Sequence, residues 1–123
     1  MVAHCFASYP NEACGILAGK NMIVSEIFIM TNTEKSPVRY LMDPEEQFKM
    51  MRKLRHKSLQ MIAIFHSHPD SAAYPSATDR DMAYYEDAVY VIVSLAEREP
   101  DVRGFSFRNE ELYEVEISVI FES

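Results

Sequence analysis

The chain has 123 residues and a formal net charge of −7, and its 48% hydrophobic and 25% charged residues are typical of one globular domain, here residues 1–123. The acidic balance argues against nucleic-acid binding, which relies on clustered Lys and Arg, and leaves room for a small protein partner. No apolar run approaches the roughly 18 residues of a membrane span, and Cys5 and Cys14 form no C-x-x-C pair or disulfide framework. We therefore predict a cytoplasmic protein that does not enter a membrane.

The first forty residues predict a helix end followed by a hairpin. We expect residues 1–8 to be the end of a helix. Residues 13–19 predict a strand of small apolar residues that another backbone can approach closely. Residues 22–30 predict its hairpin partner across a turn at Lys20-Asn21. A short strand is expected at 40–42.

A helix is predicted from Asp43 to about Lys57. Asp43 is a suitable N-cap, Pro44 suits the first turn, and Glu46 would complete a capping box. Apolar positions recur at helical spacing, which predicts that one face packs on a sheet. The residues that define this face are Phe48, Met51, Leu54 and Arg55.

The second half of the chain predicts further strands and a short helix. The apolar run 61–66 predicts a buried strand, a loop follows at 67–75, and a short helix opens near Ser76. Residues 88–95 predict another buried strand. A closing hairpin is expected across Asn109-Glu110, with arms at 102–107 and 112–120. The fold class is therefore α/β or α+β, with a central curved mixed sheet flanked by helices.

Two histidines stand two residues apart at the end of the strand predicted at 61–66. Because side chains of a strand alternate between its faces, His66 and His68 project to the same side. Neutral imidazole is the commonest metal-binding side chain. A third donor would complete a catalytic zinc site and leave the fourth position to water.

Three aspartates are candidates for the third donor. Asp70 gives H-x-H-x-D, as in metallo-β-lactamases, but Ser71 stands where that motif needs a histidine, and no histidine follows His68. A zinc deaminase is excluded because its H-x-E and P-C-x-x-C signature is absent. Asp79 and Asp81 lie about 200° apart on a helix, so only one of them can face the histidines. Ser76 and Asp79 also match a capping box without chemistry, and the two interpretations are compatible.

A catalytic base has to come from elsewhere in the chain, and Glu12 stands at the start of the small-residue strand. A lone glutamate in a loop is usually a solvated charge, so Glu12 gains meaning only in combination with the other residues. The neighbouring Cys14 is interpreted as a small buried residue, because no histidine near it in sequence is free to activate it.

These residues together resemble the JAMM, or MPN+, metalloprotease family. Its pattern is an upstream glutamate, then H-[ST]-H-P, seven residues from the second histidine to a serine, and two more to an aspartate. Glu12, His66-Ser67-His68-Pro69, Ser76 and Asp79 fill every position. The resemblance covers nearly the whole chain and looks closest to the short prokaryotic branch that acts on ubiquitin-like sulfur-carrier proteins. The segment before Glu12 departs from the family, whose members usually carry a fuller first helix there.

The resemblance implies an MPN/JAMM-like fold and a zinc-dependent hydrolase. It implies one Zn²⁺ per chain, held by His66, His68 and Asp79, with Glu12 as the base and Ser76 as a hydrogen-bond donor to the oxyanion. The implied substrate is a peptide or amide bond after the Gly-Gly tail of a ubiquitin-like or sulfur-carrier protein. The main alternative is a non-catalytic scaffold of the same fold; a DNA-repair-type relative is disfavoured by the acidic balance. The sequence leaves self-association open.

Overall fold

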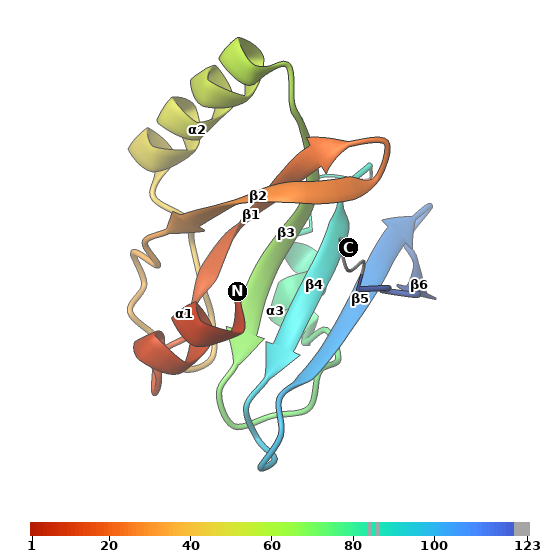
Figure 1. Ribbon diagram of the computed structural model, residues 1–123. Coiled ribbons are helices and arrows are strands. Elements are labelled where there is room, and N and C mark those ends of the chain that lie inside the picture. Colours follow the sequence, from red (N-terminus) through yellow and green to blue (C-terminus); the bar gives the residue numbers. More distant parts are fainter. Residues whose placement is uncertain (84, 86, 120–123) are drawn as a thin grey trace.

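The computed structural model describes residues 1–83, 85 and 87–119, and a six-stranded sheet forms its centre (Figure 1). The strands are β1 (Cys14–Lys20), β2 (Ile23–Met30), β3 (Gln60–His68), β4 (Val89–Ser94), β5 (Asp101–Arg108) and β6 (Glu111–Val115). They lie in the order β2-β1-β3-β4-β5-β6. Only β3 and β4 are parallel, and the other neighbouring pairs are antiparallel. The prediction of a mixed sheet is confirmed.

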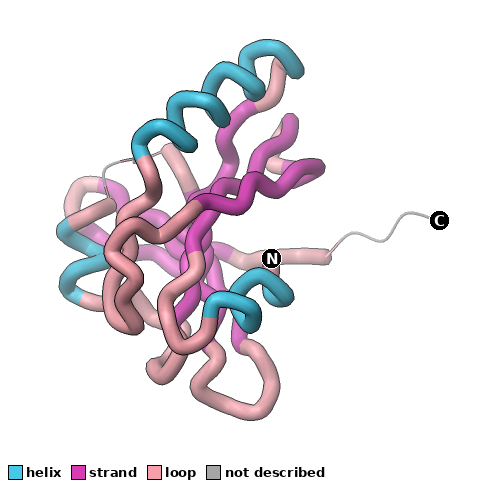
Figure 2. Tube along the Cα trace, turned by 90° about the vertical axis from the view of Figure 1, so that its left-hand side faces the viewer, coloured by secondary structure: helices cyan, strands magenta, loops and turns pink. Residues whose placement is uncertain are grey.

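The helices α1 (Val2–Ser8), α2 (Pro44–Lys57) and α3 (Ala77–Asp81) lie on both faces of the sheet. Figure 2 shows the strands from their edge, with α1 beside the N mark on the right and α3 on the left. Leu54 of α2 belongs to the same core cluster as Ile16 and Ile64, on one face. Cys5 of α1 packs with Phe65 in the cluster on the opposite face. No helix within the described residues is long and apolar enough to cross a membrane.

The strand β1 depends on its small residues, as predicted. A Cβ atom at Gly15 would lie 2.6 Å from the Phe28 carbonyl oxygen of β2 and 2.3 Å from the ring of Phe65 in β3. The hairpin turn lies one residue later than predicted, at Asn21 and Met22, whose φ angles are 52° and 62°. Positive φ at both central residues is typical of the tight turns that join twisted strands.

The prediction for α2 is right in its bounds and only partly right in its buried face, where Leu54 is buried as predicted. Asp43 caps the helix by accepting from the backbone N–H groups of the second and third helical residues. The buried side chains are Met50 and Leu54, whereas Phe48 and Met51 are 66% and 42% exposed. Helical spacing fits a stripe through Met51 and Leu54 as well as one through Met50 and Leu54. Packing against the sheet selects the stripe that contains Met50.

The predicted capping box at Glu46 is also wrong. Its carboxylate instead accepts from the backbone N–H of Thr31 (2.6 Å) and from the Thr31 hydroxyl (2.8 Å). The predicted strand at 40–42 reduces to a single bridge between Met42 and Asn32. Two backbone hydrogen bonds, Thr33 N to Leu41 O and Asp43 N to Thr31 O, and the side-chain hydrogen bonds of Asn32 hold this segment.

The closing hairpin forms, but its second arm is shorter than predicted. The strand β6 ends at Val115, and residues 116–119 lie outside any strand. Ile120, the predicted end of that arm, lies outside the described residues. The expected alternation of apolar and polar residues is therefore used as a strand only in its first half.

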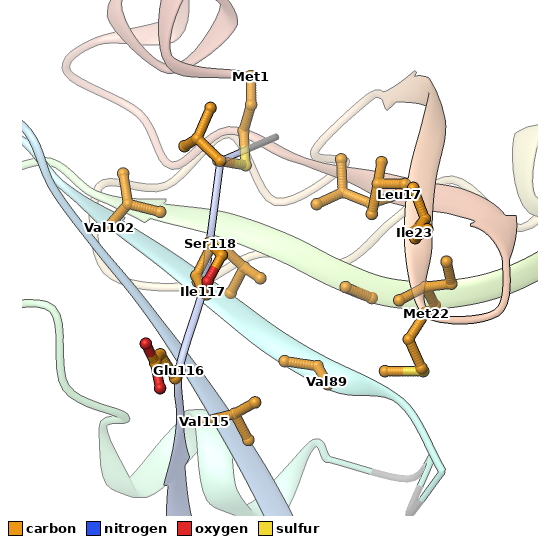
Figure 3. A pocket seen from close by; sticks show the side chains of 15 residues that line it. Met1, Leu17, Met22, Ile23, Val89, Val102, Val115, Glu116, Ile117 and Ser118 are labelled. Atoms are coloured by element: carbon orange, nitrogen blue, oxygen red, sulfur yellow. The ribbon is translucent and has the colours of Figure 1, made fainter. Parts of the chain in front are cut away.

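The face of the sheet that carries α1 also carries an open apolar groove (Figure 3). Its volume is about 410 Å³, and Figure 3 shows Leu17, Val89 and Val102 of the strands in its wall. Ile117 of the C-terminal segment closes one side. The candidate functional residues all lie on the other face, so the groove and the candidate site are separated by the sheet.

Candidate metal centre

The end of β3 and the start of α3 bring three metal-binding side chains together. His66 and His68 occupy alternate positions of β3 and therefore point to the same face. Asp79 lies in the first turn of α3, which follows the loop after β3. These are the described residues that form a cluster of metal-ligating type, and all three are buried. The structure thus brings the three predicted ligands to one point.

The donor atoms of this cluster form a tight triangle. His66 Nε2 lies 3.1 Å from His68 Nε2, and Asp79 Oδ2 lies 3.1 Å and 2.9 Å from these two nitrogens. A tetrahedral ion with ligand bonds of about 2.0 Å holds its ligands about 3.3 Å apart. The triangle is therefore close in size to one face of a tetrahedral zinc site.

Asp79 serves the helix and the cluster with the same carboxylate. Ser76 is the N-cap of α3, and its hydroxyl accepts from the Asp79 backbone N–H at 3.0 Å. In return, the Ser76 backbone N–H donates to Asp79 Oδ2 at 2.9 Å, which completes a capping box. The capping box and the ligand position are thus two uses of one residue, as the sequence allowed.

The protonation of His68 explains why the triangle fits a cation. His68 Nδ1 lies 2.8 Å from the carbonyl oxygen of Ala72. A carbonyl oxygen only accepts, so Nδ1 carries the proton, and a neutral His68 presents its Nε2 lone pair to the cluster. That lone pair faces the Asp79 carboxylate and another imidazole nitrogen. A positive charge among these atoms would remove the repulsion. It could come from a metal ion or from a proton on His68, whose pKa is lowered by burial but raised overall by its contacts with Asp79 and Ala72.

The electrostatics of the cluster follow from burial and from these contacts. Burial lowers the pKa of His66 below its ordinary value, and the neighbouring Asp79 only partly offsets it. Burial opposes the charged form of Asp79 as well, but hydrogen bonds with His66 and His68 outweigh it and hold its pKa far below the usual range. The cluster therefore presents an ionised carboxylate and, at His66, a neutral imidazole at neutral pH.

Glu12 reaches this cluster through the pairing of β1 with β3. Cys14 lies opposite His66 in the antiparallel register. The same register continued by two residues places Glu12 opposite His68 and on the same face. The Glu12 side chain is only 4% exposed, and its Oε1 atom has no hydrogen-bond partner among the described residues. Burial raises the pKa of Glu12 to about 8; His68 opposes this shift and Asp79 adds to it.

The backbone on both sides of Glu12 is fixed by segments that follow it in sequence. Ser67 N donates to Ala13 O at 3.0 Å, and Ala13 N donates to Ser67 Oγ at 2.8 Å. Glu12 N donates to Ser36 O at 2.8 Å, and the Asn32 side chain donates to Glu12 O at 3.1 Å. The position of Glu12 therefore depends on β3 and on the segment 31–43.

Two residues near the cluster were not predicted as functional. Tyr40 stacks on the His66 ring, with ring centroids 4.5 Å apart and planes inclined by 24°. Asn32 binds the backbone of Glu12 and of the residues that flank Tyr40. Neither carries a spacing signal in the sequence, because both act through contacts made across the fold.

The rejected candidates lie away from the cluster or are chemically inert. Asp70 is exposed and accepts a hydrogen bond from the Tyr9 hydroxyl at 2.9 Å. Asp81 is exposed on the outer side of α3. Cys14 is fully buried, and its burial raises the thiol pKa to about 12, which leaves it protonated and poorly nucleophilic.

Comparisons with known proteins agree with this geometry. A family model described as prokaryotic homologues of the JAB domain matches residues 1–109. The CysO-cysteine peptidase of Mycobacterium tuberculosis is 45% identical over 96 residues, which make up 76% of this chain and 66% of that protein. The desampylase of Haloferax volcanii is 33% identical over 115 residues, or 89% of this chain and 79% of that protein.

A solved structure shares nearly the whole fold. The solution structure of a protein from Desulfitobacterium hafniense superposes with a TM-score of 0.90 at 35% identity, covering 99% of this chain and 87% of that one. The matched part spans just under two thirds of the length of the mycobacterial relative.

Proposed function

The chain belongs to the family of prokaryotic homologues of the JAB domain, and on this premise we propose that it is a zinc-dependent peptidase. Its substrate is a peptide or amide bond that follows the C-terminal Gly-Gly tail of a small ubiquitin-like or sulfur-carrier protein. One observation carries the proposal: three buried donor atoms lie within 3.1 Å of one another, and the buried Glu12, whose Oε1 atom has no partner among the described residues, lies beside them.

The proposed zinc ligands are His66 Nε2, His68 Nε2 and Asp79 Oδ2. The set of two imidazoles and one carboxylate is typical of catalytic zinc, which leaves a position open. When bound, zinc supplies Lewis-acid activation of water at neutral pH. The loop between β3 and α3 holds two ligands in position, because the Ala72 carbonyl orients His68 and the capping box orients Asp79.

Glu12 is the proposed general base. Its side chain is close enough to His68 and Asp79 to feel both charges, and burial raises its pKa to about 8. A carboxyl group poised near neutral pH is suited to accept a proton in one step and to return it to the leaving amine in the next. The unpartnered Oε1 atom is the point at which we expect this proton to be held.

Ser76 is the proposed hydrogen-bond donor to the oxyanion that develops during hydrolysis. Its hydroxyl oxygen already accepts from Asp79 N, but its hydroxyl hydrogen has no acceptor among the described residues. The capping bond therefore fixes the oxygen and leaves the donor available. One such donor is typically worth about 3–4 kcal/mol of transition-state stabilisation.

Two relatives support the substrate class, since one is a CysO-cysteine peptidase and another a desampylase. The proposed path of the tail follows the outer edge of β2, which is the first strand of the sheet and has no partner on that side within the described residues. An extended tail would bind there as an added strand.

A non-catalytic scaffold is the alternative that this proposal has to exclude. The chain keeps all three ligands and the glutamate, which supports catalysis over binding alone. The cytoplasmic location and the single-domain organisation stay predictions. The two cysteines are free and buried, which suits a reducing compartment.

The proposal is tested by metal analysis and by mass spectrometry on one purified sample. Metal analysis should give about one zinc per chain. A small carrier protein whose Gly-Gly tail is extended by one cysteine, or by a short peptide, should lose that extension on incubation. A protein that holds zinc but cleaves neither carrier would favour the scaffold, and a protein without affinity for zinc would overturn the proposal.

A further inference from the structure

The two histidines of the cluster are oriented by different means. His68 donates its Nδ1 proton to the Ala72 carbonyl at 2.8 Å, which fixes both the tautomer and the ring plane. His66 Nδ1 is buried and has no hydrogen-bond partner among the described residues. A metal-ligating histidine almost always donates its second ring N–H to a carboxylate, a carbonyl or a water. His66 therefore lacks the usual means of holding its ring.

We infer that Tyr40 is the positioning residue for His66, and that ring stacking takes the place of the missing hydrogen bond; this inference rests on the proposed zinc site. The two rings lie 4.5 Å apart between centroids, with planes inclined by only 24°. A parallel ring at this distance restricts rotation of the imidazole about its Cβ–Cγ bond. It thereby keeps Nε2 directed at Asp79 Oδ2 and His68 Nε2, which lie 3.1 Å away.

The ring of Tyr40 rather than its hydroxyl carries this role. Tyr40 is half-buried, and its hydroxyl makes no hydrogen bond to any described residue. A tyrosine kept as a polar anchor would bond through its oxygen to another group of the protein. Phenylalanine should therefore replace Tyr40 with little loss, whereas an aliphatic side chain should not.

The backbone of Tyr40 is held on both sides by one side chain. Asn32 Oδ1 accepts from Leu41 N at 3.1 Å, and Asn32 Nδ2 donates to Arg39 O at 3.0 Å. The remaining bonds of this amide go to Glu34 N and to Glu12 O. All four hydrogen-bonding positions of the amide are thus used. The same residue that fixes the backbone of Glu12 also fixes the ring that stacks on His66.

The test measures zinc affinity rather than hydrolysis, using chelator competition on the wild type, Tyr40→Leu, Tyr40→Phe and Tyr90→Leu. Tyr90 is the matched control, because it is a buried tyrosine of the same core that packs on Phe107 and stacks on neither metal ligand. The absorption spectrum of the cobalt-loaded proteins reports the ligand geometry independently. Thermal unfolding of the metal-free proteins reports the general loss of packing.

We expect Tyr40→Leu to weaken zinc binding about tenfold, the low end of the effect of removing an outer partner of a ligating histidine, and to change the cobalt bands. Tyr40→Phe should stay within about twofold of the wild type, as should Tyr90→Leu despite a lower unfolding temperature. Equal zinc affinity in Tyr40→Leu and the wild type, or equal losses in Tyr40→Leu and Tyr90→Leu, would overturn the inference.

Two further outcomes remain decisive. A wild type without zinc affinity would overturn the proposed function and this inference together, whereas a zinc-binding wild type with an unaffected Tyr40→Leu would overturn the inference alone. If Tyr40→Leu does not fold, Tyr40→Met keeps a long apolar side chain without a ring and carries the same expectation.

Discussion

The ligand cluster and Glu12 lie side by side, yet the chain holds them in opposite ways. The three donor atoms of the cluster converge within 3.1 Å of one another, and its residues come from one stretch, 66–79. Glu12 comes from a segment more than fifty residues upstream, and its Oε1 atom has no partner. The geometry of the proposed ligands is therefore set locally, whereas the position of the proposed base depends on the pairing of β1 with β3.

The first prediction concerns the ligand cluster, and its effect should be the largest. Asp79→Asn or His68→Ala removes one donor of the triangle, so we expect zinc affinity to fall by more than about 100-fold, beyond the effect of losing an outer partner. Hydrolysis should then be undetectable. Zinc content after dialysis measures the effect, and Asp81→Asn, an exposed neighbour on α3, is the matched control that should keep its metal.

The second prediction separates Glu12 from the cluster. Glu12→Gln keeps the shape of the side chain and removes the proton acceptor, so hydrolysis should fall by about 10²- to 10⁴-fold while zinc remains bound. Cleavage rates and metal content are measured on the same sample. Glu34→Gln, at an exposed position of the segment 31–43, should leave both unchanged. Wild-type rates in Glu12→Gln would show that another group acts as the base.

The third prediction concerns Ser76, which caps α3 and is the proposed donor to the oxyanion. Ser76→Ala removes the oxyanion donor and the cap of α3 together, so we expect a rate loss of about 100-fold and a loss of about 1 kcal/mol in the free energy of unfolding. Ser76→Thr keeps the hydroxyl and should restore most of both. If Ser76→Ala lowered stability without slowing hydrolysis, Ser76 would be a cap alone.

The contrast between local and distant contacts also explains what the sequence could predict. His66 and His68 followed from the period of a strand, and the Ser76–Asp79 pair followed from capping-box spacing; both depend on neighbours within a few residues. The link between Glu12 and the cluster rested on a resemblance, because pairing of Cys14 with His66 is a contact between distant segments. The family match confirms that resemblance.

The errors have the same origin. The buried stripe of α2 could not be chosen from spacing alone, since Met50 and Met51 both continue a helical pattern and only the sheet decides between them. Glu46 obeyed the capping-box rule in sequence, but Thr31 offers it two donors at the end of β2. Tyr40 was assigned to a short strand, because its stacking on His66 is a contact between distant segments and leaves no local signal. In each case a local sequence rule was applied where a contact between distant segments decides the structure.

The smallest predicted effect is a pH dependence of the free energy of unfolding. It arises because burial disfavours the ionised form of Glu12. Burial raises its pKa in the folded, metal-free protein to about 8, from an ordinary value of 4.5. A carboxyl group with a raised pKa binds its proton more tightly in the folded state. Its contribution to stability is therefore complete below about pH 4.5 and is lost as the pH rises towards about 8.

Glu12→Gln removes this titration, so the variant should gain stability relative to the metal-free wild type as the pH rises from about 5 to about 8. One pKa unit corresponds to about 1.4 kcal/mol, and partial hydration of the carboxylate reduces the full conversion, so we expect a gain of about 2 kcal/mol at pH 8. Denaturant unfolding of both proteins across this range measures the difference, and the titrations of His66 and His68 are present in both. A constant difference would mean that Glu12 is solvated and ionised throughout, and that burial does not hold this carboxylate against its charge.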